Sequence, residues 1–496
     1  MQQKKKPKQS GRIPATEKLK EILGPEKVKD DELTIVAYSS DVSPVSPNNP
    51  SAVVFPVVRE DVVAILGVAD EYKIPVTVMA GGVNVVGSCI PREGGIVIDF
   101  HRMNRIIEVN TDSGYAVVEP GVSFDNFTAA LAEKGFRCGV PTSPGGSSPL
   151  GNYLSRPSCS LATRQLDGIV DLEVVLPDGT IFNTGSSQFP NAGSSLRYGP
   201  FPDLAGLYCC GYGTLGIVTK AALRIYPINE ANRLNLAGFD TYEASVDFIK
   251  DLINNNIPEH CIIWNWQFFK SLQINIVGDE YKIPPEVRLD PRKPPEGMPY
   301  VIVTTMMSGY EESMRVNDKL CAKVAAKYGG RVLTKKEARS LVDGGMKEWE
   351  ELYIKYRSVE PTSFGLGKYL AWIVLVEPKM AKDLEKWAVN ELVKFKTSPV
   401  SYYSMPFDFG RSIFFRIFCF PDPENPKLVN SIVDKYKEMY DTAMKRYGGI
   451  PLRVKNGYPN LGVVGGYGKA LHKIKQAFDP NNILSPNMGI YEEVAK

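Results

Sequence analysis

The residues best suited to chemistry in this chain are glycines, and the clearest group occupies the segment 80–87. Its members directly follow the apolar run PVTVM and are Ala80, Gly81, Gly82, Val83, Asn84, Val85, Val86 and Gly87. Glycine lets a backbone turn tightly and approach a ligand, and successive N–H groups can then bind phosphate oxygens without a lysine. The segment lacks the GxGxxG spacing and the following helix of a Rossmann site. It predicts either a pyrophosphate cradle or a plain glycine-rich turn.

Two later segments share this small-residue character. The first precedes Arg156 and contains Pro141, Thr142, Gly145, Gly146, Ser147, Gly151 and Asn152. Its backbone could approach one face of a flat isoalloxazine ring, and its hydroxyls and amide could bind the ring edge. The second runs into an apolar strand, where buried backbone could bind an adenine or a ring edge, and contains Gly211, Gly213, Gly216, Ile217 and Val218. Taken singly, each segment is more often a structural turn than a ligand site.

The elements that must position these segments change character along the chain. Between 52 and 228, short apolar strands alternate with helices and with loops rich in Gly and Pro, which predicts an α+β region. A helix is expected over 13–30, then a loop rich in Pro, Ser and Asn over 34–52, with the folded core beginning after it. From about 230, longer strands and amphipathic helices predict a second domain, a sheet with helices on one face. We therefore expect an N-terminal tail and helix over 1–46 and a first domain over 47–228. A second domain follows over 229–455, and a C-terminal segment covers 456–496.

Composition narrows the possible partners. The 496 residues suggest two or more domains, and 43% hydrophobic residues, 23% charged residues and a net charge of +2 are ordinary for a globular protein, without a sign of a nucleic-acid partner. No run of ~18 apolar residues and no signal-peptide core occurs, so we expect a cytoplasmic protein that does not span a membrane. Eight scattered cysteines form no CxxC pair, and the three histidines have no metal-ligand spacing, so we expect no metal site.

In this order, the three glycine segments resemble the FAD-binding domain of the vanillyl-alcohol oxidase and p-cresol methylhydroxylase superfamily. The resemblance is strong over 52–228, weak in the middle and strong again over the last ~50 residues. The stretches that carry it are AGGVNVVG, IVIDFHRMNRIIEVN, AVVEPGVSFDNF, GGSSPLGNYLSR, LEVVLPDGTIFNTG, GPFPDLAGLYCCGYGTLGIVTKAALRIYP and FDPNNILSPNMGIY. It implies an α+β fold with a PCMH-type FAD-binding domain of two α+β subdomains and a cap domain of antiparallel sheet and helices. It also implies that the C-terminal segment completes the FAD domain, and that the glycine segments, Arg156 and Asn487 bind FAD.

Departures from the family pattern concern how the flavin is attached. Some members link it to a histidine of the first glycine segment, where this chain has Val83. Others use a histidine or tyrosine of the cap, and the stretch 370–430 contains no histidine but does contain Tyr402 and Tyr403. We therefore expect non-covalent FAD, with a tyrosine link left open. The histidine pair and Glu-His-Gly motif of the metal-dependent D-2-hydroxyacid dehydrogenases have no counterpart here, which disfavours their mechanism.

The subgroup that oxidises para-substituted phenols resembles the chain more closely, in GPFPDLAGLY and GGIPLRVKNGY. The subgroup's aspartate beside the flavin is replaced by Thr142 and its clamp tyrosine by Leu452, whereas Arg453 remains. An arginine facing the flavin would bind a carboxylate or phenolate bidentately and stabilise developing negative charge. Alternatively, Arg453 is an ordinary surface residue on a late strand, and the sequence favours neither interpretation.

These observations favour a FAD-dependent dehydrogenase that transfers hydride from an alcohol or activated C–H of a small, anionic substrate to flavin N5. A 4-alkylphenol oxidase or methylhydroxylase is the alternative within this class. The shortage of histidine disfavours an alkylglycerone-phosphate synthase. A different alternative is a flavin-bearing electron-transfer subunit of a larger complex. The electron acceptor is left open among oxygen, a quinone, a cytochrome and another flavoprotein, and a homodimer is expected.

Overall fold

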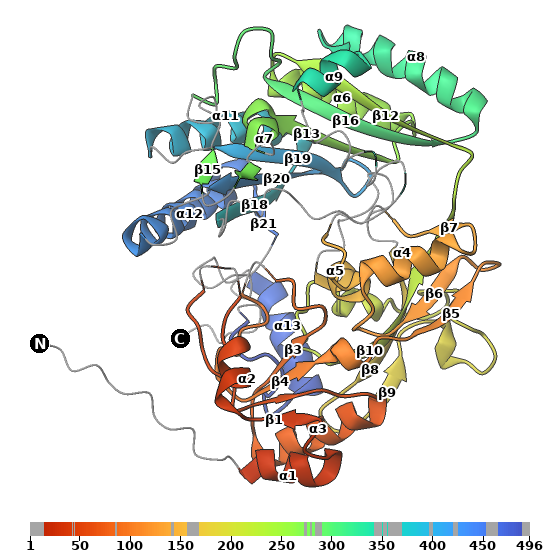
Figure 1. Ribbon diagram of the computed structural model, residues 1–496, viewed down its shortest axis with the longest axis vertical. Helices are drawn as coiled ribbons and strands as arrows, with labels where there is room; N and C mark the ends of the chain where they lie inside the picture. The colour runs from red at the N-terminus through yellow and green to blue at the C-terminus, as the bar shows by residue number, and fades with distance from the viewer. Residues whose placement is uncertain are drawn as a thin grey trace, which may run out of the picture.

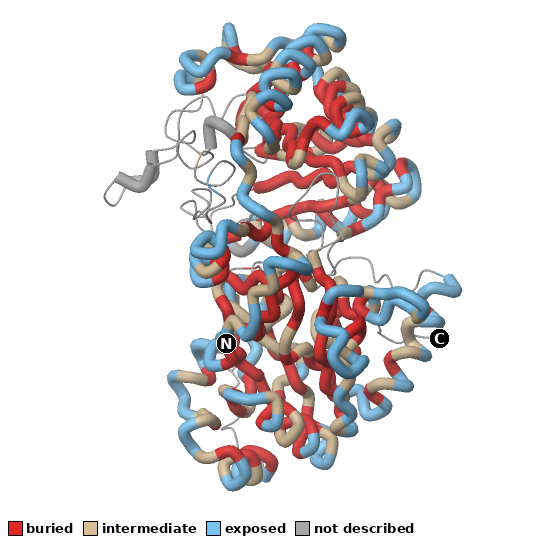
Figure 2. The backbone as a smooth tube through the Cα atoms, turned by 90° about the vertical axis from the view of Figure 1, so that its right-hand side faces the viewer, coloured by how far each residue is buried: buried red, intermediate tan, exposed pale blue. Residues whose placement is uncertain are grey.

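The computed structural model forms two lobes, one above the other in Figure 1. The lower lobe contains the described elements up to β11 (Tyr226–Pro227) and the C-terminal helix, and the upper lobe contains the described residues between 231 and 452. Buried strands lie at the middle of both lobes, and exposed backbone lies outside them (Figure 2). The α+β fold expected from the sequence is confirmed. The residues that the structure describes are 14–41, 43, 45–84, 87–139, 143–155, 168–271, 275–277, 280–282, 290–341, 350, 355, 370–395, 400–419, 425–452 and 465–488.

The first sheet of the lower lobe brings the first glycine segment to its edge. Its strand order is β1 (Val28–Lys29), β2 (Ala52–Val54), β4 (Ile96–Asp99) and β3 (Val76–Met79). The strands β2, β4 and β3 are parallel, and α3 (Arg59–Tyr72) connects β2 to β3. Because β3 ends at Met79, the glycines that follow lie at the carboxyl edge of the parallel strands, where ligands commonly bind.

The N-terminal part differs from the expectation that the folded core begins only after residue 52. The helix α1 (Pro14–Leu23) buries Leu19 completely in the same core as α3. A second helix, α2 (Glu32–Ala37), occupies the start of the expected loop. The side chain of Asp31 accepts a hydrogen bond from the Thr34 N–H and caps this helix. The local cap, rather than the Pro-rich composition that follows it, determines the structure there.

The second sheet of the lower lobe is antiparallel and presents the third glycine segment. Its strand order is β5 (Ile106–Asn110), β6 (Tyr115–Val118), β10 (Ile217–Arg224), β8 (Ile169–Val175) and β9 (Ile181–Asn183). An Asp-Gly turn joins β8 to β9, as the sequence predicts, with Gly179 at a φ of +83°. Since β10 begins at Ile217, the glycines before it lie at one end of this sheet.

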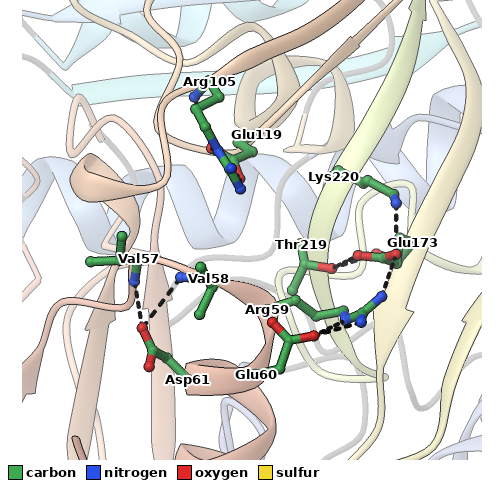
Figure 3. A network of polar contacts seen from close by, with 10 residues as sticks. All are labelled: Val57, Val58, Arg59, Glu60, Asp61, Arg105, Glu119, Glu173, Thr219 and Lys220. Carbon is green, nitrogen blue, oxygen red and sulfur yellow. Dashed lines mark hydrogen bonds and ion pairs between the residues drawn. The ribbon is translucent and has the colours of Figure 1, made fainter.

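A polar network joins the two sheets of the lower lobe (Figure 3). Glu173 on β8 accepts hydrogen bonds from Arg59 Nη1 at 3.2 Å, Lys220 Nζ at 2.8 Å and Thr219 Oγ1 at 2.8 Å. Burial alone would raise the pKa of Glu173, but the hydrogen bonds from Lys220 and Thr219 and the two positive charges lower it. The ionised carboxylate therefore ties α3 to β8 and β10.

We expect the substitution Glu173→Gln to lower the free energy of unfolding of this lobe by about 1–3 kcal/mol at pH 7, because two cations lose their buried partner. The folded-state pKa lies below the unfolded value of about 4.3. The contribution of Glu173 is therefore present above that value and lost as the pH falls through the folded pKa. Urea unfolding at pH 7 and at pH 4 should show the difference shrinking at the lower pH.

The control is Glu60→Gln, which removes an exposed carboxylate from the same arginine. An exposed ion pair contributes little, so this variant should stay within about 0.5 kcal/mol of the wild type. Equal effects of the two substitutions would contradict the assignment of Glu173 as the buried link.

The upper lobe is built on one antiparallel sheet. In order across the sheet, its strands are β17 (Arg331–Val332), β12 (Ala231–Phe239), β16 (Val301–Gly309), β13 (His260–Asn265), β19 (Ser401–Phe407), β20 (Ser412–Cys419), β18 (Leu370–Val376) and β21 (Ile450–Pro451). Four helices pack on one face and share one hydrophobic core: α6 (Tyr242–Asn254), α8 (Glu311–Lys327), α11 (Pro378–Lys394) and α12 (Pro426–Tyr447). A second apolar cluster lies on the opposite face, with α7 (Trp266–Ser271) and α9 (Lys335–Leu341). The antiparallel sheet with helices is as predicted.

The end of the chain returns to the lower lobe. The helix α13 (Gly465–Phe478) lies in the lower lobe (Figure 1), where its Ile474 and Phe478 pack against a hydrophobic core. Beyond it, Leu484 forms a parallel bridge with Val76 on β3. The Val76 N–H donates to the Ile483 carbonyl at 2.7 Å, and the Ser485 N–H donates to the Val76 carbonyl at 2.8 Å. The return of the C-terminal segment, implied by the family resemblance, is confirmed.

Candidate cofactor site

The three glycine segments meet around one cavity in the lower lobe. Its empty space, including the open mouth, is about 1040 Å³. The predicted site residues that line it are Ala80, Gly81, Gly82, Val83, Asn84, Ser147, Gly151, Asn152, Gly211, Gly213, Gly216, Ile217 and Val218. Segments with 58 or more residues between them thus share a single wall, as one extended ligand requires.

Two glycines show why side chains are excluded from this wall. A Cβ added at Gly81 would lie 2.7 Å from the Ser148 backbone nitrogen, so the first segment packs directly on the second. A Cβ added at Gly213 would lie 2.6 Å from Val78 Cγ2, and Gly213 also has a φ of +73°, which favours glycine. The close approach leaves a cradle of bare backbone. Such a cradle fits FAD. Its phosphate oxygens accept hydrogen bonds from backbone N–H groups, and its flat rings pack against apolar surfaces.

The polar side chains that line the wall are neutral and belong to asparagine, serine, threonine, cysteine and tyrosine residues. The Asn152 Nδ2 donates to Ser143 Oγ at 2.5 Å, and the Asn84 Nδ2 donates to Ser88 Oγ. Burial raises the pKa of Cys89, another wall residue, to about 12, so its thiol is protonated at neutral pH. Among the residues that the structure describes, no three His, Cys, Asp or Glu side chains gather as a metal site would need. The neutral side chains and bare backbone of this wall suit a large organic cofactor.

A buried ion pair holds the third segment to the C-terminal return. Lys475 Nζ donates to the Thr214 carbonyl at 2.8 Å, the Leu484 carbonyl at 2.9 Å and Asp479 Oδ2 at 2.5 Å. Asp479 also accepts the N–H groups of Ile483 and Leu484. Burial lowers the pKa of Lys475, and the Asp479 carboxylate opposes that shift. We call Lys475 and Asp479 the C-terminal clamp.

The clamp is not evident in the sequence, because its helix carries several lysines and lysine side chains are ordinarily solvated. The signal available was the i, i+4 spacing of Lys475 and Asp479 directly before a proline.

Several predicted residues do not line the cavity. The Gly87 N–H donates to Asp41 Oδ2 at 2.9 Å, and the Gly145 carbonyl accepts the Asp125 N–H at 3.1 Å. Gly146 lies between the second segment's turn residues, with open space where a side chain would be. The Asn487 side chain bonds Glu93 instead of reaching the cavity. The predicted residues that lie outside the described part of the chain are Val85, Val86, Pro141, Thr142, Arg156 and Arg453.

The face of the upper sheet opposite the four helices carries an aromatic cluster, which we define as Trp264, Phe268, Tyr403 and Phe418. Neighbouring ring centroids are 4.7 to 5.9 Å apart. The Arg416 guanidinium lies 4.3 Å from the Phe418 ring centroid and donates to Tyr403 Oη at 3.2 Å.

Arg416 was also missed in the sequence. The alternation of RSIFFRIFCF places it with Phe414 and Phe418 on one face of the strand, which is the signal that could have found it.

The two tyrosines considered for a flavin link point to opposite faces. Tyr402 is fully buried under the helices, and its hydroxyl donates to Glu385 Oε1 at 2.6 Å. Burial raises the pKa of Glu385, which also accepts the Tyr300 hydroxyl at 2.6 Å. Tyr403 belongs to the aromatic cluster on the other face. The hydroxyl of Tyr402 is therefore committed to the core of the upper lobe.

Comparison with known proteins identifies the lower lobe. Residues 50–185 match the family described as FAD binding domain. The glycolate oxidase subunit GlcD of Bacillus subtilis is 30% identical over 48% of this chain and 50% of its own length, so the chain spans about half of that relative. The flavoprotein subunit of 4-cresol dehydrogenase (hydroxylating) of Pseudomonas putida is 25% identical over 95% of this chain and 94% of its own. The crystal structure of p-cresol methylhydroxylase with substrate bound has a TM-score of 0.81 at 24% identity and covers 97% of both chains.

The fold and the glycine-lined cavity define a PCMH-type FAD-binding flavoprotein. Residues 50–185 match an FAD-binding domain, so the cofactor of the lower lobe is FAD, and the chain as a whole has the fold of the p-cresol methylhydroxylase structure. In the part of the chain that the structure describes, no helix is long and apolar enough to cross a bilayer.

Proposed function

We propose that this chain is a dehydrogenase that uses FAD to oxidise an alcohol or an activated C–H bond of a small, anionic organic substrate. The observation that carries the proposal is the convergence of three glycine segments on one cavity. When bound, FAD supplies a hydride acceptor at N5. The chain's own backbone at segments 80–84 and 211–218 would bind and orient the cofactor. Val83 lines the cavity with a hydrocarbon side chain that offers no nucleophile, which supports non-covalent FAD.

Two arginines, Arg416 and Arg453, support the proposal that the substrate is anionic. Leu452 packs against the apolar cluster that includes the aromatic residues, and Arg453 follows it in the chain. Arg416 lies within that cluster and is only 5% exposed. A guanidinium among aromatic rings suits a carboxylate or phenolate attached to an apolar group. Recognition of an anion would hold the substrate C–H near flavin N5, the positioning that hydride transfer needs.

Anaerobic titration of the purified holoprotein tests the proposal. Small hydroxy acids and aryl alcohols are added in turn, and loss of the visible flavin absorbance is followed. We expect at least one of them to bleach the flavin stoichiometrically. If none does and only a partner protein reduces the flavin, the chain is an electron-transfer subunit and the proposal is wrong.

Oxidation of a 4-alkylphenol is the second candidate, favoured by the four rings of the aromatic cluster and by the likeness to the 4-cresol dehydrogenase subunit. A substrate panel with a dye acceptor separates the two candidates. Turnover restricted to para-hydroxyaryl compounds would establish the second candidate and exclude the first. Turnover of aliphatic hydroxy acids would do the reverse.

We expect Arg453→Met to raise KM for anionic substrates about 10- to 100-fold, because a charged hydrogen bond contributes about 1.5–3 kcal/mol. KM for a neutral alcohol of the same shape should change little. Steady-state kinetics with both substrates checks this expectation. The matched control is Arg446→Met, since Arg446 is exposed at the end of α12. Equal loss for the charged and the neutral substrate would contradict the role given to Arg453.

A further inference from the structure

A carboxylate at the end of β4 joins a tyrosine and a histidine beside the first glycine segment. Asp99 is 1% exposed and accepts the Tyr38 hydroxyl at 2.5 Å through Oδ2. Its Oδ1 contacts His101 Nδ1 at 2.5 Å and accepts the His101 N–H at 2.8 Å. The carboxylate therefore fixes the orientation of the imidazole and assigns Nδ1 to Asp99.

The imidazole lies next to the cavity wall. A Cβ added at Gly82 would lie 3.7 Å from His101 Cε1, and both Gly82 and Phe100 line the cavity. This neighbourhood follows from the sheet, because β3 and β4 pair in parallel and the residues after them share one edge. Since Nδ1 is bonded to Asp99, the nitrogen left for a ligand is Nε2. The side chain is 52% exposed, so it is accessible from solvent.

The charged groups around His101 favour its protonated form. Asp99 on β4 is the acidic group in contact with it, and β3 contributes the uncharged Met79. The Tyr38 hydroxyl, after α2, reaches the other oxygen of Asp99. Arg102 is directed away, towards the Phe55 ring and the Glu26 carbonyl. The hydrogen bond to Asp99 raises the pKa of His101, although partial burial opposes this.

We propose that His101, oriented by Asp99 and Tyr38, is a cation that binds the diphosphate of FAD at the first glycine segment. The diphosphate carries two negative charges, and segment 80–84 offers it backbone N–H groups but no charged side chain. A protonated imidazole beside Gly82 supplies a charge that the backbone lacks. The inference concerns cofactor binding and does not depend on which substrate is oxidised.

A pH dependence of FAD affinity follows. If FAD binds the protonated imidazole better than the neutral one, FAD binding takes up protons as the pH nears the pKa of His101. Affinity is then highest below the His101 pKa of the apoprotein and decreases as the pH rises through it. A neutral residue at position 101 removes this dependence.

The test measures the Kd of the apoprotein for FAD between pH 5.5 and 8.5 by quenching of flavin fluorescence. We expect His101→Gln to weaken binding about fivefold to tenfold at pH 5.5, which is the effect of one partly screened charge. The two proteins should converge at pH 8.5. The control, His472→Gln, changes a histidine on α13 and should follow the wild-type curve. Competition by ADP, which carries the same diphosphate, should be weakened to the same extent.

Three results would overturn the proposal: an unchanged Kd at pH 5.5, an equal loss at every pH, or a loss for FAD without a loss for ADP. If the His101→Gln apoprotein does not fold, the rate of FAD release from the holoprotein on dilution gives the same comparison. A second variant, Asp99→Asn, keeps the imidazole but removes its carboxylate. It should move the decrease in affinity to lower pH, and an unmoved curve would exclude Asp99 as the positioning residue. Because these measurements need no turnover, they stand apart from any failure of the proposed oxidation.

Discussion

Lys475→Met is expected to lower the free energy of unfolding of the lower lobe by about 3–5 kcal/mol, the usual cost of removing one partner from a buried ion pair. Lys475 and Asp479 are only 4% and 1% exposed. Loss of the ammonium leaves the Asp479 carboxylate with two backbone N–H partners and leaves the Thr214 and Leu484 carbonyls without this donor. Urea unfolding, followed by far-UV circular dichroism and by release of flavin fluorescence, measures the effect.

The same substitution should weaken FAD binding, because Thr214 lies in the glycine segment that lines the cavity. The control is Lys473→Met on the same helix, where the side chain is exposed. It should unfold within about 0.5 kcal/mol of the wild type and retain FAD. If Lys475→Met unfolds at the wild-type urea concentration, the clamp does not hold the C-terminal return.

Isosteric replacement separates charge from shape within the clamp. Asp479→Asn keeps one oxygen acceptor but removes the negative charge beside Lys475. Its effect should fall between those of the wild type and Lys475→Met, since the carbonyls of Thr214 and Leu484 still accept from the ammonium. The clamp therefore accounts for a feature that the sequence alone did not explain, namely how the last residues of the chain are joined to a cavity formed some 260 residues earlier.

The glycine segments were predictable because their requirement is local. A tight turn or a backbone approach demands glycine whatever surrounds it, so the positions of Gly81 and Gly213 could be read from composition and order. The α+β class and the sheet of the upper lobe followed from the alternation of strands and helices. Secondary structure was less well predicted where a helix cap determines it. At Asp31, one capping side chain outweighs the composition of the loop that follows.

The polar side chains of the site were harder to predict because they act over long range. Tyr38 reaches Asp99, the partner of His101, across 61 residues, and Lys475 reaches Thr214 across 261. The spacing of such residues in the sequence does not show whether they form a buried pair or lie exposed to solvent. For Asn487 the family resemblance implies a cofactor contact, which stays a prediction; in the structure its side chain bonds Glu93 and does not line the cavity.

The second large effect is expected from Gly81→Ala. The new Cβ would lie 2.7 Å from the Ser148 nitrogen and 3.0 Å from the Gly146 carbonyl oxygen. Both neighbours are backbone atoms and cannot rotate away, so the first and second segments must separate. Overpacking of this kind costs about 1–3 kcal/mol, and here the strain is relieved by opening the cavity wall. We expect the Kd for FAD to rise up to about 100-fold, which corresponds to ~3 kcal/mol.

Two controls make this expectation specific to the contact. Gly146→Ala changes a neighbouring glycine of the second segment that has open space around the added Cβ, so FAD affinity should stay near the wild-type value. Gly67→Ala lies at an exposed position inside α3, also in open space, and should stabilise the helix by up to about 1 kcal/mol. If Gly146→Ala weakens FAD binding as much as Gly81→Ala, flexibility of the glycines, rather than the close approach of the two segments, builds the cavity. If only Gly81→Ala weakens it, the absence of a single Cβ is what allows two distant segments to form one binding wall.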